Sequence, residues 1–139
     1  MCIRDRYCLA EVKDDKIGVE SYEDWGKDSV EFFIDENMSK SSPYDDDDAQ
    51  YRTSADGVET HGESTDGDKY TSKTTKVDGG YIVEARIKLK AAAGKKIGFD
   101  LQVNNDPGNG SRGSIAKWND ATNSTWEDMS GIGVLEFAK

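Results

Sequence analysis

Cysteine, histidine and long apolar runs are all scarce in this sequence, and each scarcity excludes a class of protein. The only cysteines, Cys2 and Cys8, are so close together that a disulfide between them would add little stability. They have no second cysteine pair or histidine cluster beside them, since His61 is the single histidine, and this excludes the usual zinc arrangements. No apolar run approaches the stretch of about 18 residues that a membrane-spanning helix needs, and no signal-peptide pattern is visible.

Positive charge is also in deficit. The 139 residues include 18 Lys and Arg against 28 Asp and Glu, which gives a net charge of −10. Nucleic acids and anionic membranes bind basic surfaces, so neither is expected as a partner. The length suits one domain with a real hydrophobic core, and 35% of the residues are hydrophobic.

Alternation of apolar and polar residues is the dominant pattern, and no segment shows a sustained helical period. The strongest example is residues 81–89, where every second residue is apolar. Residues 55–68 are rich in Gly, Ser, Thr and acidic residues and are expected to form a loop or weak hairpin, with His61 solvated. Strands are expected at 7–12, 28–34, 49–53, 69–77, 81–89, 97–103, 115–118 and 133–137. Short strands separated by turns predict an all-β protein, an antiparallel β-sandwich of the jelly-roll kind.

The first six residues differ from the rest of the chain. M-C-I-R-D-R lacks strand alternation, and residues 7–12 then follow as a strand already under way. We therefore expect residues 1–6 to be a non-native leader, and residues 7–139 to form one domain that lacks its first strand or strands.

One segment, residues 25–52, combines the features of a binding site. Trp25 precedes a strand in which Glu31 lies on the face opposite its apolar neighbours. Glu31 is therefore either a solvated strand position or part of a ligand-binding wall. Arg52 lies on the next predicted strand, also facing away from the core, where it can form a charge-assisted pair with Glu31. Gln102 has the same outward orientation in its own strand.

The connection between these two strands is strongly acidic and ends in four consecutive aspartates. Such a run is a solvated loop in most proteins. Carboxylate, amide and carbonyl oxygens are also the ligands that Ca²⁺ prefers, although the spacing is not that of an EF-hand. Both interpretations stay open from the residues alone. The candidate calcium ligands are Asp35, Asn37, Asp45, Asp46, Asp47 and Asp48.

Two of the three tryptophans are candidates for ligand contact. Trp25 and Trp126 are expected in loops beside strand ends, where an indole has no core to fill, whereas Trp118 is expected in the core. The axial C–H faces of a pyranose ring are apolar, so two indole planes would remove them from water. Fixed polar groups would then select the hydroxyl pattern, because an unpaired buried polar group is costly.

Five stretches, taken in order, resemble one known family. They are D-S-V-E-F-F-I-D-E-N, D-D-D-D-A-Q-Y-R, G-G-Y-I-V-E-A-R-I, I-G-F-D-L-Q-V-N and W-N-D-A-T-N-S-T-W-E-D. Together they resemble the family 9 carbohydrate-binding modules, β-sandwich domains appended to xylanases and other polysaccharide-degrading enzymes. The resemblance spans residues 7–139, and only residues 55–75 follow no recognisable pattern.

The resemblance implies a non-catalytic domain that grips a sugar end between two tryptophans. In this chain the tryptophans would be Trp25 and Trp126, and the polar partners would be Glu31, Arg52, Gln102 and Asn123. It also implies binding to the reducing ends of β-glucan and xylan chains, as in cellulose and xylan, and structural calcium in the loops. The chain would be part of a larger multidomain glycoside hydrolase such as a xylanase, monomeric and extracellular.

Three other functions are weighed against this one. A glycosidase needs two carboxylates about 5–10 Å apart across a cleft. Glu31 with Glu84 or Asp100 is a conceivable pair, but no nucleophile–base motif accompanies it. A calcium-stabilised structural or adhesive sandwich without sugar binding is the main alternative. Haem binding needs axial ligands such as His61 and Met38, and both fall outside the matched motifs.

Overall fold

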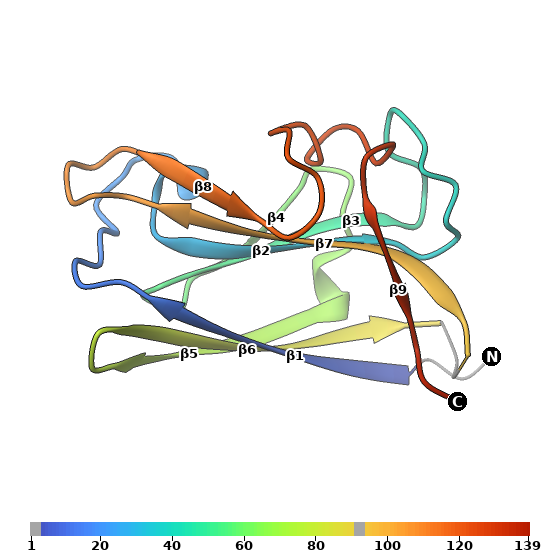
Figure 1. The fold of residues 1–139 in the computed structure, drawn as a ribbon, viewed down its shortest axis with the longest axis horizontal. Coiled ribbons are helices and arrows are strands. Elements are labelled where there is room, and N and C mark those ends of the chain that lie inside the picture. The colour runs from blue at the N-terminus through green and yellow to red at the C-terminus, as the bar shows by residue number, and fades with distance from the viewer. Residues whose placement is uncertain (1–3, 91–93) are drawn as a thin grey trace.

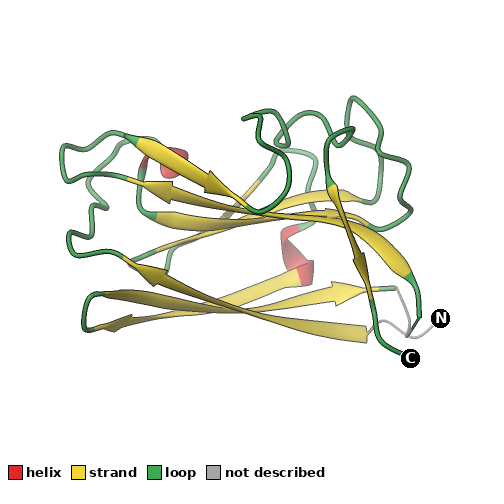
Figure 2. Cartoon of the chain, viewed as in Figure 1, coloured by secondary structure: helices red, strands yellow, loops and turns green. Residues whose placement is uncertain are grey.

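Two antiparallel sheets stacked face to face make up the chain (Figure 1). The structure is a computed structural model that describes residues 4–90 and 94–139. Within these residues the only helices are two short 3-10 turns, η1 (Asp24–Gly26) and η2 (Gly67–Lys69) (Figure 2). The predicted antiparallel β-sandwich is therefore confirmed. None of the helices in the described part of the chain is long and apolar enough to span a membrane.

The smaller sheet has three strands in the order β1–β6–β5 and the larger has six. The small sheet consists of β1 (Arg4–Lys13), β5 (Tyr70–Val77) and β6 (Gly80–Leu89). The large sheet has the order β4–β3–β2–β7–β8, with β9 also paired to β7. Its strands are β2 (Ser29–Asp35), β3 (Asp48–Ser54), β4 (Glu59–His61), β7 (Lys96–Asn105), β8 (Ser114–Lys117) and β9 (Gly133–Glu136).

All eight expected strands are present, and their limits differ from the prediction by a few residues. The ninth strand, β4, lies in the polar segment that was expected to form a loop or weak hairpin. The first strand starts at Arg4, so residues 4–6 of the expected leader pair with β6. The other three residues of that segment, including Cys2, lie outside the described residues. The non-native origin of residues 1–6 and the missing strands stay predictions.

The core lies between the sheets and is formed by the alternating apolar residues. The apolar set of β6, from Tyr81 to Leu89, is fully buried, as the period-two pattern predicts. It faces Phe32 and its apolar neighbours on β2. The rings of Tyr51 and Tyr70 stack at 4.7 Å between centroids and so connect β3 with β5. Full burial of one large apolar side chain, such as Phe32, stabilises the fold by about 1.5–3 kcal/mol.

A second, smaller apolar cluster lies on the outer side of the large sheet. Phe33, from the outward face of β2, packs against Met129 and Ile132, with Tyr44 beside them. These contacts fix the acidic connection and residues 119–132 over the sheet, and Figure 1 shows both loops above it. As a result every residue of β2 is buried, on both faces. The loops and the outer face of the sheet enclose the site described below.

Trp118 does not lie in the core, and that prediction was wrong. Its side chain is 53% exposed. It follows the last residue of β8 at the sheet margin, where its ring meets the edge of Phe99 at 5.7 Å between centroids. The backbone of Gly133 comes so close that a Cβ there would lie 2.7 Å from the indole. Since β8 ends at Lys117, the indole rests on the sheet edge and not between the layers.

Candidate functional site

A row of polar residues crosses the outer face of the large sheet. The antiparallel register places Arg52 and Gln102 directly opposite Glu31 on its two sides. The row continues to Thr60 on β4 and Lys117 on β8. Outward orientation alone puts each side chain on this face, and strand register then brings them into line.

Glu31 is not a solvated strand position, because it is only 2% exposed. Its Oε1 accepts a short hydrogen bond from Arg52 Nε, which confirms the expected charge-assisted pair. Gln50 Nε2 approaches the other carboxylate oxygen at 3.4 Å. Arg52 also donates from Nη1 to Thr60 Oγ1 at 3.0 Å. The guanidinium is thus held from both sides of β3, by Glu31 on β2 and Thr60 on β4.

Asn104 is the hub of this polar network and was missed by sequence reasoning. Its Nδ2 donates to Glu31 Oε1 at 3.2 Å and to Ser29 Oγ at 2.9 Å. Its Oδ1 accepts from Gln102 Nε2 at 2.8 Å and from Arg112 Nη1 at 3.2 Å. All four hydrogen-bonding positions of this buried amide are therefore occupied. A fully satisfied buried network fixes the positions of its members.

The outer face and its loops enclose a cavity of about 730 Å³. All six predicted sugar contacts line this one cavity: Trp25, Trp126, Glu31, Arg52, Gln102 and Asn123. The two tryptophans are 45% and 53% exposed, and they come from opposite ends of the sequence. The floor offers charged and amide groups, while the indoles offer apolar surface. This combination suits a ligand with both hydroxyl groups and apolar faces.

Trp25 is carried by η1, which enters β2 through a tight turn. Gly26 packs closely on Ser21 there, since a Cβ would lie 2.2 Å from Ser21 Oγ. Asp28 then joins three segments, because its carboxylate accepts from the backbone N–H groups of Gly18 and Asp106, both at 2.6 Å. Burial raises the pKa of Asp28 to about 6, and the nearby Asp14 carboxylate adds to the shift. This arrangement fixes the start of β2 below Trp25.

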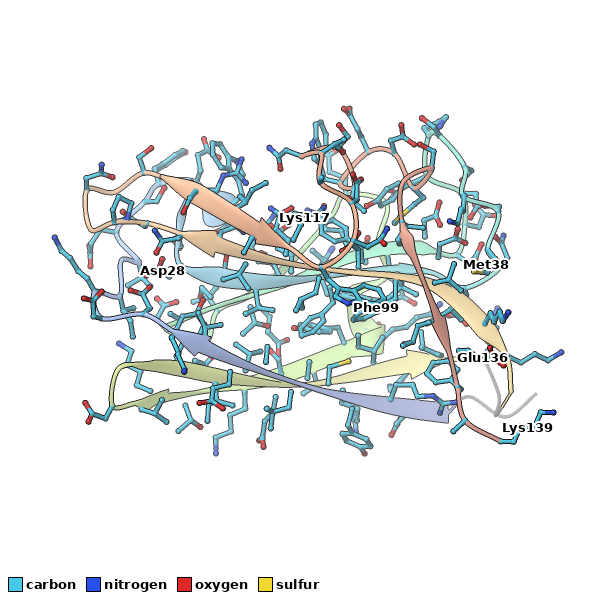
Figure 3. All side chains as sticks on the ribbon, in the orientation of Figure 1. Asp28, Met38, Phe99, Lys117, Glu136 and Lys139 are labelled. Carbon is cyan, nitrogen blue, oxygen red and sulfur yellow. The ribbon has the colours of Figure 1, made fainter. Side chains whose placement is uncertain are left out.

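Trp126 is positioned by its buried neighbour Thr125. Lys117 Nζ donates to Thr125 Oγ1 at 2.6 Å, and this hydroxyl donates in turn to Asp120 Oδ2 at 2.9 Å. The Tyr44 hydroxyl donates to the Thr125 carbonyl. Burial lowers the pKa of Lys117, whose ammonium lies 5.0 Å from the Phe33 ring centroid on the outer side of the sheet (Figure 3). Hydrogen bonds from Lys117 and Tyr44 therefore anchor the loop that carries Trp126 and Asn123 at Thr125, and the bond to Asp120 braces the loop from within.

The acidic connection separates into two groups. Asp35 and Asp48 are buried and lie directly opposite each other in the register of β2 and β3. One oxygen of each, Oδ1, has no hydrogen-bond partner. Asn37 instead lies near the surface and donates to both Asp45 and Asp47. Asp46 is exposed.

Calcium ligation by these residues stays a prediction. Among the described residues, no three His, Cys, Asp or Glu side chains converge in a way that could hold a metal ion. Two buried carboxylates with unpaired oxygens nevertheless fit a hard cation, which takes its further ligands from carbonyl groups and water. Gly98, opposite Asp35, leaves room beside it, since a Cβ there would lie 2.8 Å from the aspartate Cβ.

Several residues in or beneath the cavity were not selected from the sequence as site residues; Asn104 lies beneath it and the others line it. Gln50 shares the face of Arg52, and Asn104 shares that of Gln102, so strand alternation could have found both. Tyr44 and Arg112 come from loops, where no periodic signal exists. His61, expected to be merely solvated, lies on β4 at the cavity wall.

Neither proposed carboxylate pair flanks the cavity. Glu84 is exposed on the small sheet, opposite Leu9, and so belongs to the other layer of the sandwich. Asp100 is buried and accepts backbone N–H groups from Leu101, Asn119 and Asp120. Its carboxylate closes the loop after β8 and does not face Glu31 across a cleft.

Comparisons with known proteins agree with this arrangement. Residues 5–139 match a family described as carbohydrate family 9 binding domain-like. The chain is 41% identical to an endo-1,4-beta-xylanase A from Thermoanaerobacterium saccharolyticum and to the exoglucanase XynX of Acetivibrio thermocellus, over 93% of its residues in each case. It is 40% identical to the Thermotoga neapolitana endo-1,4-beta-xylanase A over 96% of its residues. The chain spans only 11–13% of the length of these relatives.

Two solved structures have the same fold. Both are family 9 carbohydrate-binding modules from Caldicellulosiruptor kristjanssonii. The complex with cellotriose superposes with a TM-score of 0.90 at 32% identity, covering 95% of this chain and 68% of that one. The complex with glucose superposes with a TM-score of 0.92 at 31% identity, covering 97% and 72%.

Fold and site together define a non-catalytic carbohydrate-binding β-sandwich. The curated relatives are polysaccharide-degrading enzymes in which such a domain is a small part of a long chain. The chain belongs to family 9 of the carbohydrate-binding modules.

Proposed function

We propose that the cavity binds the reducing end of a β-glucan or xylan chain, with Trp25 and Trp126 on the two faces of the terminal sugar. The observation that carries this proposal is the convergence of both exposed indoles on one cavity whose floor is the Glu31–Arg52 pair. The indoles cover the apolar faces of the ring. The fixed floor then selects hydroxyl positions, because a mismatched sugar leaves buried polar groups unpaired.

Arg52, Glu31 and Gln102 are the floor contacts, and Asn123 closes the cavity from the loop side. Arg52 keeps unused guanidinium hydrogens after its bonds to Glu31 and Thr60, and these are suited to sugar oxygens. Glu31 offers carboxylate oxygens that can accept hydroxyl hydrogens. The bound domain would keep an attached, secreted xylan-degrading enzyme near its substrate. No step in this function requires covalent chemistry.

Two tryptophans that are equally exposed provide the test. Trp126 and Trp118 are each 53% exposed, but only Trp126 lines the cavity. Trp126→Ala should weaken cellobiose binding at least about 30-fold, the effect of losing a central aromatic contact. Trp118→Ala should leave binding within about twofold of the wild type. Isothermal titration calorimetry measures both. Equal losses in the two variants would refute the assignment of the cavity.

Recognition of a chain end is tested with reduced sugars. Cellobiitol and xylobiitol have an opened terminal ring, which lacks the flat face that two indoles need. Calorimetry should show binding of cellobiose and xylobiose and loss of binding for both alditols. Equal affinity for the reduced and unreduced sugars would refute end recognition. No binding of any of the four would favour a calcium-stabilised structural sandwich without sugar binding.

We further propose that Asp35 and Asp48 hold a structural calcium ion. Their unpaired, buried oxygens are the support for this site, and burial together with Asp35 raises the pKa of Asp48. A cation between the two strands would offset the repulsion between the carboxylates. Binding to the folded state alone stabilises it by about 2.7 kcal/mol when free calcium is 100 times Kd. EDTA should therefore lower Tm, and added calcium should restore it. An unchanged Tm would leave the acidic run a solvated loop.

A further inference from the structure

Arg112, in the loop between β7 and β8, lines the cavity without belonging to the expected sugar contacts. Its guanidinium carbon lies 4.8 Å from the centroid of the Trp25 ring. Its Nη1 donates to Asn104 Oδ1 at 3.2 Å. Within residues 4–90 and 94–139, no carboxylate forms an ion pair with it. An ion pair therefore does not explain the position of this half-buried cation, and its other contacts must.

Trp25 is a proposed sugar contact whose side chain the hydrophobic core does little to hold in place. It stands on a turn of three residues, and its indole is 45% exposed, so the core does not fix it. A guanidinium placed over an indole is attracted by the ring quadrupole, and its flat shape stacks well. Arg112 therefore restricts the rotation of Trp25 on one side of the ring.

Asn104 fixes Arg112 in turn. The same amide oxygen that accepts from Arg112 also accepts from Gln102, and the amide nitrogen donates to Glu31. The network therefore runs from the floor of the cavity through Asn104 and Arg112 to the indole. The orientation of Trp25 relative to Glu31 is thereby coupled to buried hydrogen bonds.

We propose that Arg112 is a positioning residue for Trp25, holding one face of the indole so that the other is presented to the sugar. The proposal rests on the proposed function, since it concerns the same cavity. It differs in assigning Arg112 no contact with the ligand: the residue acts through the ring, by reducing the freedom that the indole would otherwise lose on binding.

The test combines calorimetry with ¹⁹F NMR of the full chain labelled with 5-fluorotryptophan. The three tryptophan resonances are assigned by single Trp→Phe substitutions. Arg112→Gln should weaken cellobiose binding about two- to fivefold, as loss of an exposed cation–π contact implies. It should also shift the Trp25 resonance in the absence of sugar. Arg112→Lys keeps the charge but not the flat donor group and should be intermediate. Arg86→Gln, on the small sheet, is the matched control and should change neither quantity.

Three results would overturn the proposal. One is a Trp25 resonance that does not respond to Arg112→Gln, and another is a shifted resonance with unchanged affinity. The third is an equal fold-loss from Arg112→Gln in the wild-type and Trp25→Phe backgrounds, which would mean direct contact with the sugar. If the wild type fails to bind cellobiose, the proposed function fails, while the ¹⁹F response still decides the Trp25 contact. Should Arg112→Gln fail to fold, Arg112→Lys carries the same comparisons.

Discussion

Removal of the Arg52 charge should destabilise the domain strongly, because it leaves Glu31 buried and unpaired. The two side chains are 12% and 2% exposed, so solvent cannot replace the lost partner. After Arg52→Met, Glu31 keeps only the amide contacts from Asn104 and Gln50. Breaking a buried pair in this way costs about 3–5 kcal/mol. For a chain of this length each kcal/mol corresponds to about 3–5 °C, so Tm should fall by about 9–25 °C.

Thermal melts monitored by circular dichroism measure the effect, and two further variants test its cause. Arg86→Met removes an exposed pair with Asp5, 3.9 Å apart, and should cost less than about 0.5 kcal/mol. Glu31→Gln in the Arg52→Met background removes the buried charge and should restore about 1–3 kcal/mol of the free energy of unfolding. This is the interaction energy typical of two residues in contact. A cost below about 1 kcal/mol for Arg52→Met, or no recovery in the double variant, would refute the reasoning.

Three further predictions concern other parts of the structure. The pKa of Asp28 is raised from 3.8 to about 6 in the folded state, so the proton on Asp28 stabilises the fold below about pH 4, and this stabilisation is lost as the pH rises through 6. Tm measured in EDTA should therefore be higher at pH 5 than at pH 7, and the difference should be smaller in Asp28→Asn. An equal change of Tm with pH in the two proteins would contradict this. Asp48→Asn should abolish the response of Tm to calcium, whereas the exposed Asp46→Asn should keep it, and a response retained in both would place any calcium site elsewhere. Thr125→Val leaves Lys117 Nζ and Asp120 Oδ2 without the hydroxyl that they share, so it should lower the free energy of unfolding by about 1–3 kcal/mol and weaken cellobiose binding. Wild-type affinity by calorimetry would contradict the anchoring role of Thr125.

Local alternation was enough to predict the layers of the fold. The apolar set from Tyr81 to Leu89 and the neighbours of Glu31 on β2 read as strand faces from the sequence, and they are the two sides of the core. Period-two patterning is a property of each strand by itself, so it needs no knowledge of partners. The short strand β4 escaped prediction because three residues without apolar alternation carry no such signal.

Six of the residues that line the cavity were also predicted from the sequence, through ordered motifs and the outward orientation of Glu31, Arg52 and Gln102. What the sequence could not give is the environment of these residues. Glu31 is buried because Phe33, two residues further along β2, packs against Met129 and Ile132 and so holds the loop 119–132 over the sheet. Whether a residue on an outward face meets water or another segment depends on contacts between remote parts of the chain.

Tertiary structure alone decided the second layer of the site. Asn104 can join the hydrogen bonds of the site because strand register places it beside Ser29 and Glu31. Arg112 contacts Trp25 because the two loops that carry them lie at the same end of the sheet. Trp118 and Trp126 are the same residue type in similar loop contexts, yet only one lines the cavity. Sequence determines which face a side chain takes within its own strand, whereas the packing of loops determines what that face encloses.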